Sequence, residues 1–547
     1  MRLLPLLLGL LALPAPAPEQ TPATVPVGPA WRDDLRLLAR ELPRRHPDLF
    51  HRMSRASWDS AVAALVRRLP RLSRNQALVS LMELVALPHD GHTSLSPLFD
   101  PAFRVHYYPV QFELFEDGLY VRAAAERYAS VVGARVIRIG WASAEEAVAG
   151  VARTLPHEND WWVRAWAPWR LAIPEILDGL GLAADPDNLP LVVERAGKRD
   201  TVTLHPAGAL EPHGHDPAGP IDRTGWVDMR TSAEVPLWLQ HAGRPYWMEY
   251  RPRERLLYVS YRGVVSLPQP TNEEFWRGVF TLADSAPVDR LVLDLRDNGG
   301  GNAFYNRQVV RGLIARPALD RPDRLFVIIG GRTFSAAMNL VLDLEQWTSA
   351  TFVGTPTGNA TLFFGDHTPL LLPRNGLTVN ISSLPWYPSD PRDTREFKAP
   401  VWYTPITSDD YRAGRDPALQ TILDPARRPS IAEALGPALA AGDTALDAGL
   451  AQLRSLPLNR FRDLEGEVNA WGYRLLAGGN QEGAIAVFRL NTRAYPQSAN
   501  TFDSLGEALA AAGRRNEAIA AYRHALSVNP GFQSSRAALE RLGSAAR

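Results

Sequence analysis

The feature that most constrains the fold is a pattern of strand, glycine turn and helix that is repeated between residues 291 and 357. The strands are three short apolar runs, at residues 291–296, 325–329 and 350–354. Alternation of strands with helices predicts βαβ units and a parallel sheet. In such sheets functional groups collect at the carboxyl ends of the strands. Ser335 lies at such an end, between the second strand and a helix that is expected to start after residue 337, and is the first candidate for chemistry.

Ser335 has two possible roles on local sequence. A serine hydroxyl reacts at neutral pH only if a base accepts its proton and donors stabilise the oxyanion. The nearby helix start offers free backbone N–H groups, and the glycine turn at residues 299–301 could present more. The alternative is that Ser335 simply caps the helix, which is a common role for serine.

Length and composition set the broad class of protein. A chain of 547 residues predicts several domains, and its 46% hydrophobic content is ordinary for a globular protein. The net charge is zero and the basic residues are spread out, so the sequence does not indicate a nucleic-acid partner. The absence of cysteine excludes disulfides and thiol catalysis. No cofactor and no metal are predicted.

The first residues read as a targeting signal. A basic start, a short apolar run and small residues over 1–17 are typical of a secretory signal peptide. We therefore expect a periplasmic or secreted protein, with membrane attachment only if the signal stays uncleaved.

The chain divides into a series of predicted domains, which together make a multidomain α/β protein. After the signal at 1–17 the expected order is a linker at 18–30, a helical N-terminal domain at 31–98, a β-domain with a helical insertion at 104–205, a connecting segment at 206–250, a mixed or parallel βαβ catalytic core at 251–425, linker helices at 426–466 and α-helical repeats at 467–547.

The last 80 residues contain an internal repeat with a period of 34 residues. The positions that recur are Gly472, Ala484, Phe488 and Pro496, which are followed by Gly506, Ala518, Tyr522 and Pro530. This period and pattern are typical of tetratricopeptide repeats, which commonly hold protein partners. Two repeats are fewer than the three or so needed for independent stability. We therefore expect them to pack on a neighbouring helix, for which residues 429–455 are the candidate.

Three motifs in the chain carry a family resemblance. They read Asp-Leu-Arg-Asp-Asn-Gly-Gly-Gly at 294–301, Thr-Phe-Ser-Ala-Ala at 333–337 and Val-Gly-Thr-Pro-Thr-Gly at 353–358. Together they resemble the C-terminal processing (tail-specific) serine peptidase family. The resemblance covers about residues 30–425, and the β-domain at 104–205 is similar to the family's PDZ-like module.

The resemblance implies a peptidase with a peptide or protein substrate. It makes Ser335 the nucleophile, with oxyanion donors from Gly299 or Gly300 and from Ala336. The bacterial processing branch has a lysine base shortly after the third motif, where this chain reads Gly-Asn-Ala-Thr at 358–361. A Ser–Lys dyad is therefore not expected, and Lys398, the nearest lysine downstream, stands in the wrong context.

A second branch, which resembles the tricorn protease, takes its base from an N-terminal histidine. The tetrapeptide Asp-Gly-His-Thr at 90–93 matches that loop and makes His92 the candidate base, with a side-chain pKa that suits proton transfer. The alternative is a histidine that only orders its loop. Glu396 is the best match for the branch's glutamate, although Asp393 is close. Gly91 replaces the second serine of the tricorn site.

Other readings stay open beside the peptidase. The same fold could be a catalytically inactive protein that binds peptides or lipids. An α/β-hydrolase is less favoured, because no Gly-x-Ser-x-Gly elbow surrounds Ser335. Asp294 and Arg296 are expected to form a structural ion pair or buried hydrogen bonds. His213 and His215 could pair on a metal or lie in a solvated loop. The cluster of tryptophans at 161–169 is expected in the core, or at a substrate entrance.

Overall fold

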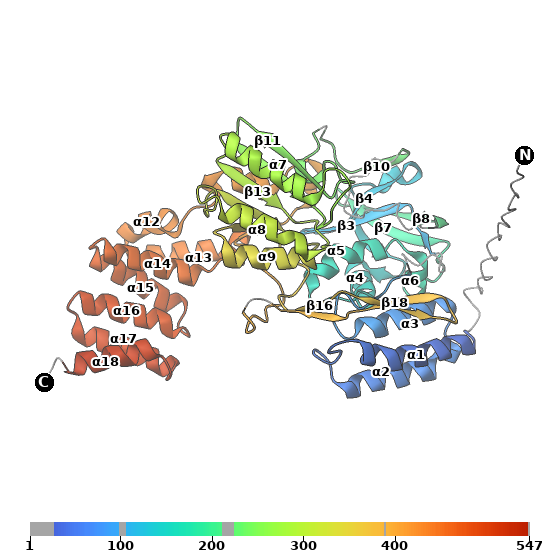
Figure 1. Cartoon of the computed structure of the whole chain (residues 1–547), viewed down its shortest axis with the longest axis horizontal. Helices are drawn as coiled ribbons and strands as arrows, with labels where there is room; N and C mark the ends of the chain where they lie inside the picture. Colours follow the sequence, from blue (N-terminus) through green and yellow to red (C-terminus); the bar gives the residue numbers. More distant parts are fainter. Residues whose placement is uncertain (1–26, 98–104, 210–223, 233, 388–389, 545–547) are drawn as a thin grey trace, which may run out of the picture. The chain divides into compact units, whose positions relative to one another are not determined.

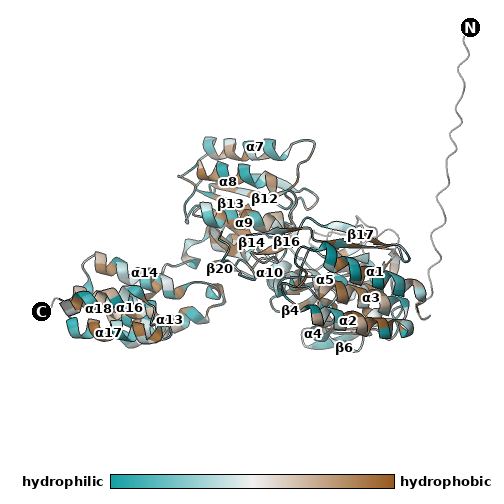
Figure 2. Ribbon diagram, turned by 60° about the horizontal axis from the view of Figure 1, so that its bottom comes forward, coloured by the Kyte–Doolittle hydropathy of each residue, from teal (hydrophilic) through white to brown (hydrophobic). Residues whose placement is uncertain are grey.

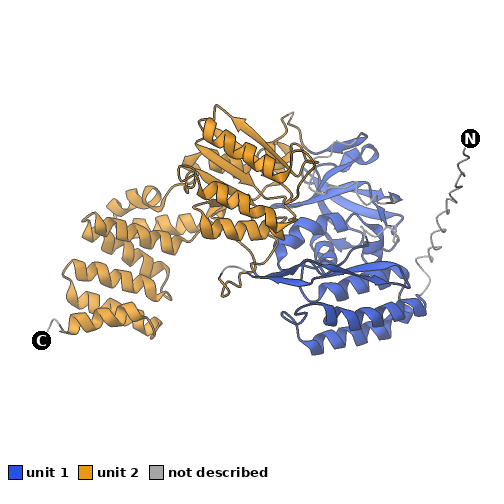
Figure 3. Ribbon diagram, viewed as in Figure 1, with its two compact units in different colours: residues 1–229, 362–387 blue, residues 230–361, 388–547 orange. Residues whose placement is uncertain are grey.

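The computed structural model describes residues 27–97, 105–209, 224–232, 234–387 and 390–544. The chain forms two compact units (Figure 3): unit 1 comprises residues 1–229 and 362–387, and unit 2 comprises residues 230–361 and 388–547. The proposed signal at 1–17 and the pair His213 and His215 lie outside the described residues. Within the described parts of the chain, no helix has the length and apolar character needed to cross a bilayer.

Unit 1 begins with the predicted helical segment. Its helices are α1 (Pro29–Arg45), α2 (Arg55–Arg68) and α3 (Arg74–Ala86). Helix α1 starts at Pro29, so the last two residues of the expected linker, 29 and 30, belong to the helix. Helix α3 begins with a capping box between Ser73 and Gln76, an arrangement that satisfies two backbone donors at once. Most of α3 is buried, so the helix anchors the start of the following loop, which contains residues 90–93.

A hairpin from late in the chain completes unit 1. Strands β17 (Thr368–Leu372) and β18 (Leu377–Ile381) form a three-stranded sheet with the short strand β1 (Ser94–Leu95). In this sheet Leu95 pairs with Val379. The sequence prediction placed this hairpin inside the catalytic core at 251–425, whereas residues 362–387 pack in unit 1. The reason is burial, because the inward side chains of the hairpin join the hydrophobic core of unit 1.

The second part of unit 1 is a seven-stranded sheet with helices in one connection (Figure 1). Its strands are β3 (Val110–Phe115), β4 (Gly118–Ala125), β5 (Arg135–Ile139), β6 (Ala142–Ser143), β7 (Leu189–Arg195), β8 (Lys198–Leu204) and β10 (Trp226–Asp228). The predicted hairpin is present as β7 and β8, which pair antiparallel. The predicted helical insertion follows β6 as α4 (Ala144–Ala152), α5 (Asp160–Arg170) and α6 (Pro174–Gly179).

Unit 2 contains the predicted βαβ core. The sheet has the order β11-β12-β13-β14-β15-β20. Its strands are β11 (Tyr246–Arg251), β12 (Leu256–Tyr261), β13 (Arg290–Asp294), β14 (Leu325–Ile329), β15 (Thr351–Gly354) and β20 (Trp402–Tyr403). All neighbours from β12 to β20 are parallel, and only β11 runs antiparallel at the edge. The connecting helices are α7 (Asn272–Ser285), α8 (Asn306–Ile314) and α9 (Ala336–Trp347). The prediction of a parallel sheet is confirmed.

The rest of unit 2 is helical. After α10 (Ser408–Arg412) and α11 (Pro417–Leu423) come α12 (Ile431–Ala441), α13 (Asp443–Ser455), α14 (Leu464–Ala477), α15 (Gln481–Ala494), α16 (Ala499–Ala511), α17 (Arg515–Val528) and α18 (Gln533–Ser544). Brown and teal alternate along these helices (Figure 2), as amphipathic helices require. The neighbouring helices expected at 429–455 are present, because α12 and α13 share one hydrophobic cluster with α14 and α15.

The 34-residue period is visible as one repeated packing contact. A Cβ atom on Gly472 of α14 would lie 2.6 Å from the ring of Phe488, and one on Gly506 of α16 would lie 2.6 Å from the ring of Tyr522. In both hairpins the ring of one helix therefore rests on a glycine of its partner. The repeated glycines are required by this close approach of side chain to backbone.

Candidate active site

Ser335 lies in the turn between strand β14 and helix α9. It is half-buried and stands directly before Ala336, the first residue of α9. Its backbone has φ 55° and ψ −126°, a combination that is strained for a residue with a side chain. A strained turn from strand to helix also exposes the nucleophile in α/β-hydrolases, although Ser335 lacks their Gly-x-Ser-x-Gly sequence. Ser335 does not use its side chain to cap the helix, so the simple capping role is wrong.

The glycine turn after β13 lies against Ser335. A Cβ atom on Gly300 would lie 2.6 Å from the Cβ atom of Ser335 and 2.9 Å from the backbone nitrogen of Ala336, so only glycine fits there. The backbone N–H of Gly300 donates to Asn298 Oδ1 at 2.9 Å. Gly299 has open space on its Cα. The N–H of Ala336 belongs to the first turn of a helix, where backbone donors have no partner within the helix.

Asn359 holds the backbone of the serine and was not predicted as a functional residue. Its side-chain Oδ1 accepts a hydrogen bond from the N–H of Ser335 at 2.5 Å, and the residue is fully buried. Its Nδ2 is also buried and has no hydrogen-bond partner among the described residues. The sequence did offer a clue to this residue, because Asn359 lies in the segment where the family resemblance predicts a catalytic lysine.

A buried ion cluster stiffens the end of strand β13. Arg296 donates to both carboxylate oxygens of Asp416, at 3.2 and 2.8 Å, and to Asp294 at 3.0 Å. Tyr258 donates to Asp294 at 2.6 Å. Burial lowers the pKa of Arg296, but Asp294 and Asp416 raise it well above its ordinary value. The expected structural ion pair of Asp294 and Arg296 is confirmed, and it fixes the strand end from which the glycine turn starts.

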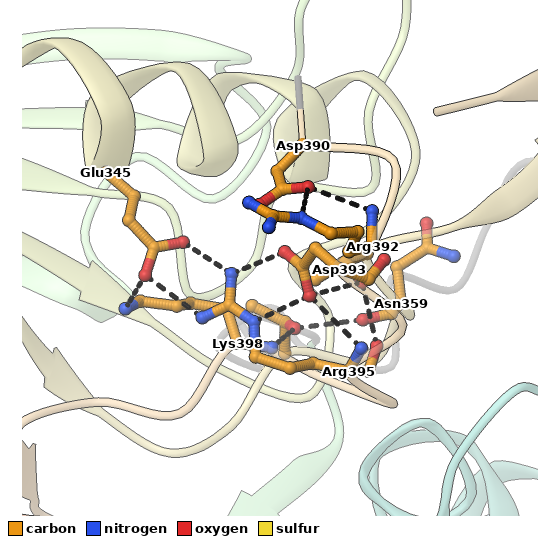
Figure 4. A network of polar contacts seen from close by, with 9 residues as sticks. Glu345, Asn359, Asp390, Arg392, Asp393, Arg395 and Lys398 are labelled. Atoms are coloured by element: carbon orange, nitrogen blue, oxygen red, sulfur yellow. Dashed lines mark hydrogen bonds and ion pairs between the residues drawn. The ribbon is translucent and has the colours of Figure 1, made fainter. Parts of the chain in front are cut away.

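Charged side chains surround the segment after residue 390 (Figure 4). Lys398 Nζ donates to Glu345 of helix α9 at 2.6 Å, and Arg395 bridges Glu345 and Asp393 with distances of 2.8 and 2.7 Å. Lys398 is therefore held in an ion pair, in agreement with its exclusion as a base. Asp393 is likewise held by Arg395, which disfavours it as the third catalytic residue.

Glu396 is exposed on the surface of unit 2. The segment that carries it runs beside residues 357–361, since the N–H of Thr361 donates to the carbonyl of Arg395 at 3.0 Å and that of Thr357 to the carbonyl of Lys398 at 3.2 Å. Glu396 also lines a cavity of about 550 Å³ with Phe461 and Arg462. The backbone thus brings its segment next to the one that contains Asn359.

His92 lies in unit 1, in the loop between α3 and β1. Its ring stacks on Phe363, with centroids 5.6 Å apart and planes at 13°. Its backbone N–H donates to Asp90 Oδ1 at 3.0 Å. A Cβ atom on Gly365 would lie 3.7 Å from Nε2, so this glycine packs against that edge of the ring. Burial lowers the pKa of His92 to about 4, against the opposing charge of Asp90, which keeps the ring neutral at neutral pH.

Two buried carboxylates stand beside His92. Asp90 accepts a hydrogen bond from His46 at 2.9 Å, and the N–H of Gly91 donates to Glu158 Oε1 at 2.9 Å. Burial, together with the charge of Asp90, raises the pKa of Glu158 to about 8. One ligand atom each from Asp90, His92 and Glu158 lie within 4.8 Å of one another. The Asp90 carboxylate is already engaged by His46, so we assign no metal to this group.

Comparisons with known proteins place the fold. No protein-family model matches the chain, and no curated protein matches it either. Among solved structures, mature CPAF complexed with lactacystin aligns with a TM-score of 0.52 at 13% identity, over 73% of this chain and 98% of that chain. The photosystem II D1 C-terminal processing protease aligns at 14% identity with a TM-score of 0.35, over 73% of this chain and 97% of that chain. The tricorn protease aligns at 12% identity with a TM-score of 0.33, over 73% of this chain and 37% of that chain. The chain therefore shares a mixed α/β fold with CPAF.

Proposed function

We propose that this chain is an exported serine peptidase that cleaves peptide bonds through an acyl-enzyme on Ser335. The observation that carries the proposal is the strained backbone of Ser335 in the turn between β14 and α9, since such strain at a strand end is typical of a nucleophile. The fold shared with mature CPAF supports the same conclusion. The apolar start at residues 1–17 supports export, to the periplasm or the medium.

In the proposed reaction the oxygen of Ser335 attacks the scissile carbonyl carbon. His92 accepts the hydroxyl proton as the new C–O bond forms, and then gives it to the leaving amine as the C–N bond breaks. In deacylation His92 accepts a proton from water, and the water oxygen attacks the acyl carbon. The proton then passes to the oxygen of Ser335 as the acyl C–O bond breaks. A neutral His92 is required to accept the proton, and burial favours that neutral form.

The oxyanion of the tetrahedral intermediate needs backbone donors. Ala336 is supported as one donor by its place at the start of α9. Gly299 is favoured over Gly300 as the other, because the N–H of Gly300 already donates to Asn298. Glu396 remains the candidate that orients the serine or the histidine. Its support is the match of its segment to the tricorn-like pattern and the position of that segment beside residues 357–361.

The pairing of His92 with Ser335 is supported by chain connectivity. Asn359 holds the N–H of Ser335, and Phe363 stacks on the ring of His92. These two supporting residues are four positions apart in the chain. Four residues span at most about 14 Å, so the covalent chain limits how far the two supports can separate. We therefore favour the tricorn-like arrangement with a histidine base.

The remaining parts are assigned by pattern. We propose a PDZ-like role for the sheet at 104–205 and tetratricopeptide repeats at 467–547 that hold a protein partner. The repeated contacts of Gly472 and Gly506 support the second assignment. The alternative to a peptidase is an inactive protein that binds peptides or lipids on the same fold. A cavity lined with tryptophans in unit 1 is the observation that favours it.

Labelling with a fluorophosphonate probe separates the two functions. A peptidase with an activated Ser335 should gain one covalent adduct, detected by intact mass, and lose it in Ser335→Ala. The control Ser349→Ala removes an exposed serine from the same unit and should label like the wild type. His92→Ala should slow labelling strongly, whereas His205→Ala, at an exposed histidine of unit 1, should not. Absence of any adduct between about pH 6 and 9, where a histidine base is neutral, would favour the binding protein.

A further inference from the structure

Unit 1 contains a cavity that the proposed reaction does not use. Its volume is about 510 Å³, within the range of sites that hold small ligands. The apolar part of its wall consists of Leu155, Pro156 and three tryptophans of helix α5, Trp162, Trp166 and Trp169. The tryptophan rings contact each other in sequence, with centroids 5.2 and 6.0 Å apart. The tryptophans are half-buried rather than sealed in the core, so the cavity has an aromatic wall that a ligand can reach.

One cation stands in this apolar wall, and the described residues provide no acid to balance it. Arg170, the last residue of α5, lines the cavity and is only 4% exposed. Its Nη1 donates to the carbonyl oxygen and to Oγ1 of Thr154, both at 3.0 Å. Among the residues that the structure describes, no carboxylate forms an ion pair with it. Burial lowers the pKa of Arg170 to about 9, which leaves the side chain charged at neutral pH.

A buried charge without a partner is costly unless something balances it. A guanidinium has five N–H donors in a planar fork, and Thr154 uses only one nitrogen of that fork. The group that matches the rest in shape and charge is a carboxylate, which guanidinium binds with two parallel hydrogen bonds. The tryptophans beside it would cover an apolar body.

We propose that this cavity binds an apolar molecule that ends in a carboxylate, with Arg170 as the partner of the anion and the tryptophans of α5 as its walls. Such a carboxylate can come from a free fatty acid or from the C-terminus of a peptide with apolar last residues. Gly91 and Ser94 also line the cavity, so the ligand would lie beside the loop that carries His92. The proposal does not depend on peptidase activity, because binding alone is claimed.

Calorimetric titration of the full chain with dodecanoate and with dodecanol tests the role of the carboxylate. The wild type should bind one dodecanoate and hold dodecanol at least about tenfold more weakly, since a hydrogen-bonded charge pair is lost. Arg170→Gln should reduce dodecanoate to the level of dodecanol and leave dodecanol unchanged. Arg164→Gln, on the same helix with an exposed ion pair to Glu116, should bind both ligands like the wild type.

Equal binding of dodecanoate and dodecanol by the wild type would overturn the proposal, and so would full dodecanoate affinity in Arg170→Gln. If circular dichroism shows that Arg170→Gln does not fold, the comparison of the two ligands on the wild type still decides. Trp166→Ala should then weaken both ligands together.

The source of the carboxylate is separated by competition. A short peptide that ends in Leu-Leu-Phe is compared with its C-terminal amide as competitors of dodecanoate. Displacement by the acid but not by the amide assigns the site to a chain terminus. Displacement by neither, with dodecanoate bound, assigns it to a free fatty acid. Displacement by the amide as strongly as by the acid contradicts a carboxylate site.

Discussion

Ser335 depends on its neighbours for its conformation. A serine with φ 55° and ψ −126° relaxes unless the surroundings hold it. Two contacts do so, one with Gly300, which has no side chain to push the serine away, and one with Asn359, which accepts the serine's N–H. Asn359 is thereby a positioning residue. Its Nδ2, which has no partner among the described residues, is a buried donor beside the serine.

Substitution of Asn359 tests this positioning role. Asn359→Ala should lower kcat roughly 10- to 100-fold with little change in KM, because the nucleophile loses its fixed geometry. Asn359→Asp keeps an acceptor oxygen for the N–H of Ser335 and should recover part of the rate. Asn302→Ala, which removes a cap from a short helix nearby, is the control. A rise in KM with unchanged kcat would show that Asn359 acts on substrate binding instead.

The pH dependence of cleavage tests the environment of His92. Burial lowers its pKa to about 4, so the ring is neutral and can accept a proton at all higher pH values. We expect kcat/KM to stay level on acidification from pH 7 to about 5 and to fall about tenfold per pH unit below about 4. Tryptophan fluorescence at each pH checks that the chain is folded. An acid limb near 6.5 would mean that His92 is solvated in the working enzyme.

The sequence predicted some of these residues and not others. Ser335 could be found because a strand end, a glycine pair and a helix start are local signals. Asn359 was seen only as the absence of a lysine, because nothing local shows that its side chain turns back to a serine 24 residues earlier. The stacking of His92 on Phe363 joins residues far apart in the chain, and no periodicity reports such a contact.

At the scale of elements, the parallel sheet was predictable and the inserted hairpin was not. Strands β13, β14 and β15 are continuous apolar runs, as expected when both faces of a sheet are buried. Strand β18 alternates apolar and polar residues, but its partner β1 is only two residues long and lies nearly 300 positions earlier. Pairing of that kind is set by tertiary burial and leaves no signature in a single sequence.

The repeated helical hairpins allow a matched test of packing. Gly472→Ala and Gly506→Ala each place a Cβ atom 2.6 Å from an aromatic ring, so each should destabilise the helical segment by about 1–3 kcal/mol. Gly436 in helix α12 has no atom within 4 Å of such a Cβ. Gly436→Ala should instead stabilise the helical segment by about 0.5–1 kcal/mol, because alanine has a higher helix propensity than glycine. Urea unfolding measures the change in the free energy of unfolding for each variant. Equal changes at all three glycines would contradict the packing explanation.

At the scale of the whole molecule, the chain builds unit 1 from two separate stretches. Five side chains of the hairpin enter the core of unit 1: Leu370, Leu372, Leu377, Val379 and Ile381. Burial of one aliphatic side chain contributes about 1.5–3 kcal/mol, so the five together rival the whole stability of a domain, about 5–15 kcal/mol. Unit 1 is therefore incomplete without residues 362–387.

Fragments of the chain test this dependence. Residues 27–229 alone should show no cooperative thermal unfolding, whereas the same fragment joined to residues 362–387 through a flexible linker should regain it. The control is the joined fragment with Val379→Asp, which places a charge opposite Leu95 and should behave like the short fragment. Cooperative unfolding of residues 27–229 alone would show that the hairpin is dispensable.

The late position of this hairpin sets an order for events during synthesis. A ribosome makes the amino-terminal unit first, yet strand β1 has no partner until residue 381 has been added. Domains generally fold in the order in which they emerge. Unit 1, however, cannot complete its fold until the parallel core of unit 2 has also been synthesised. For a chain proposed to leave the cytoplasm, the delay has a use, since a unit that cannot close early stays extended enough to be threaded through a translocation channel.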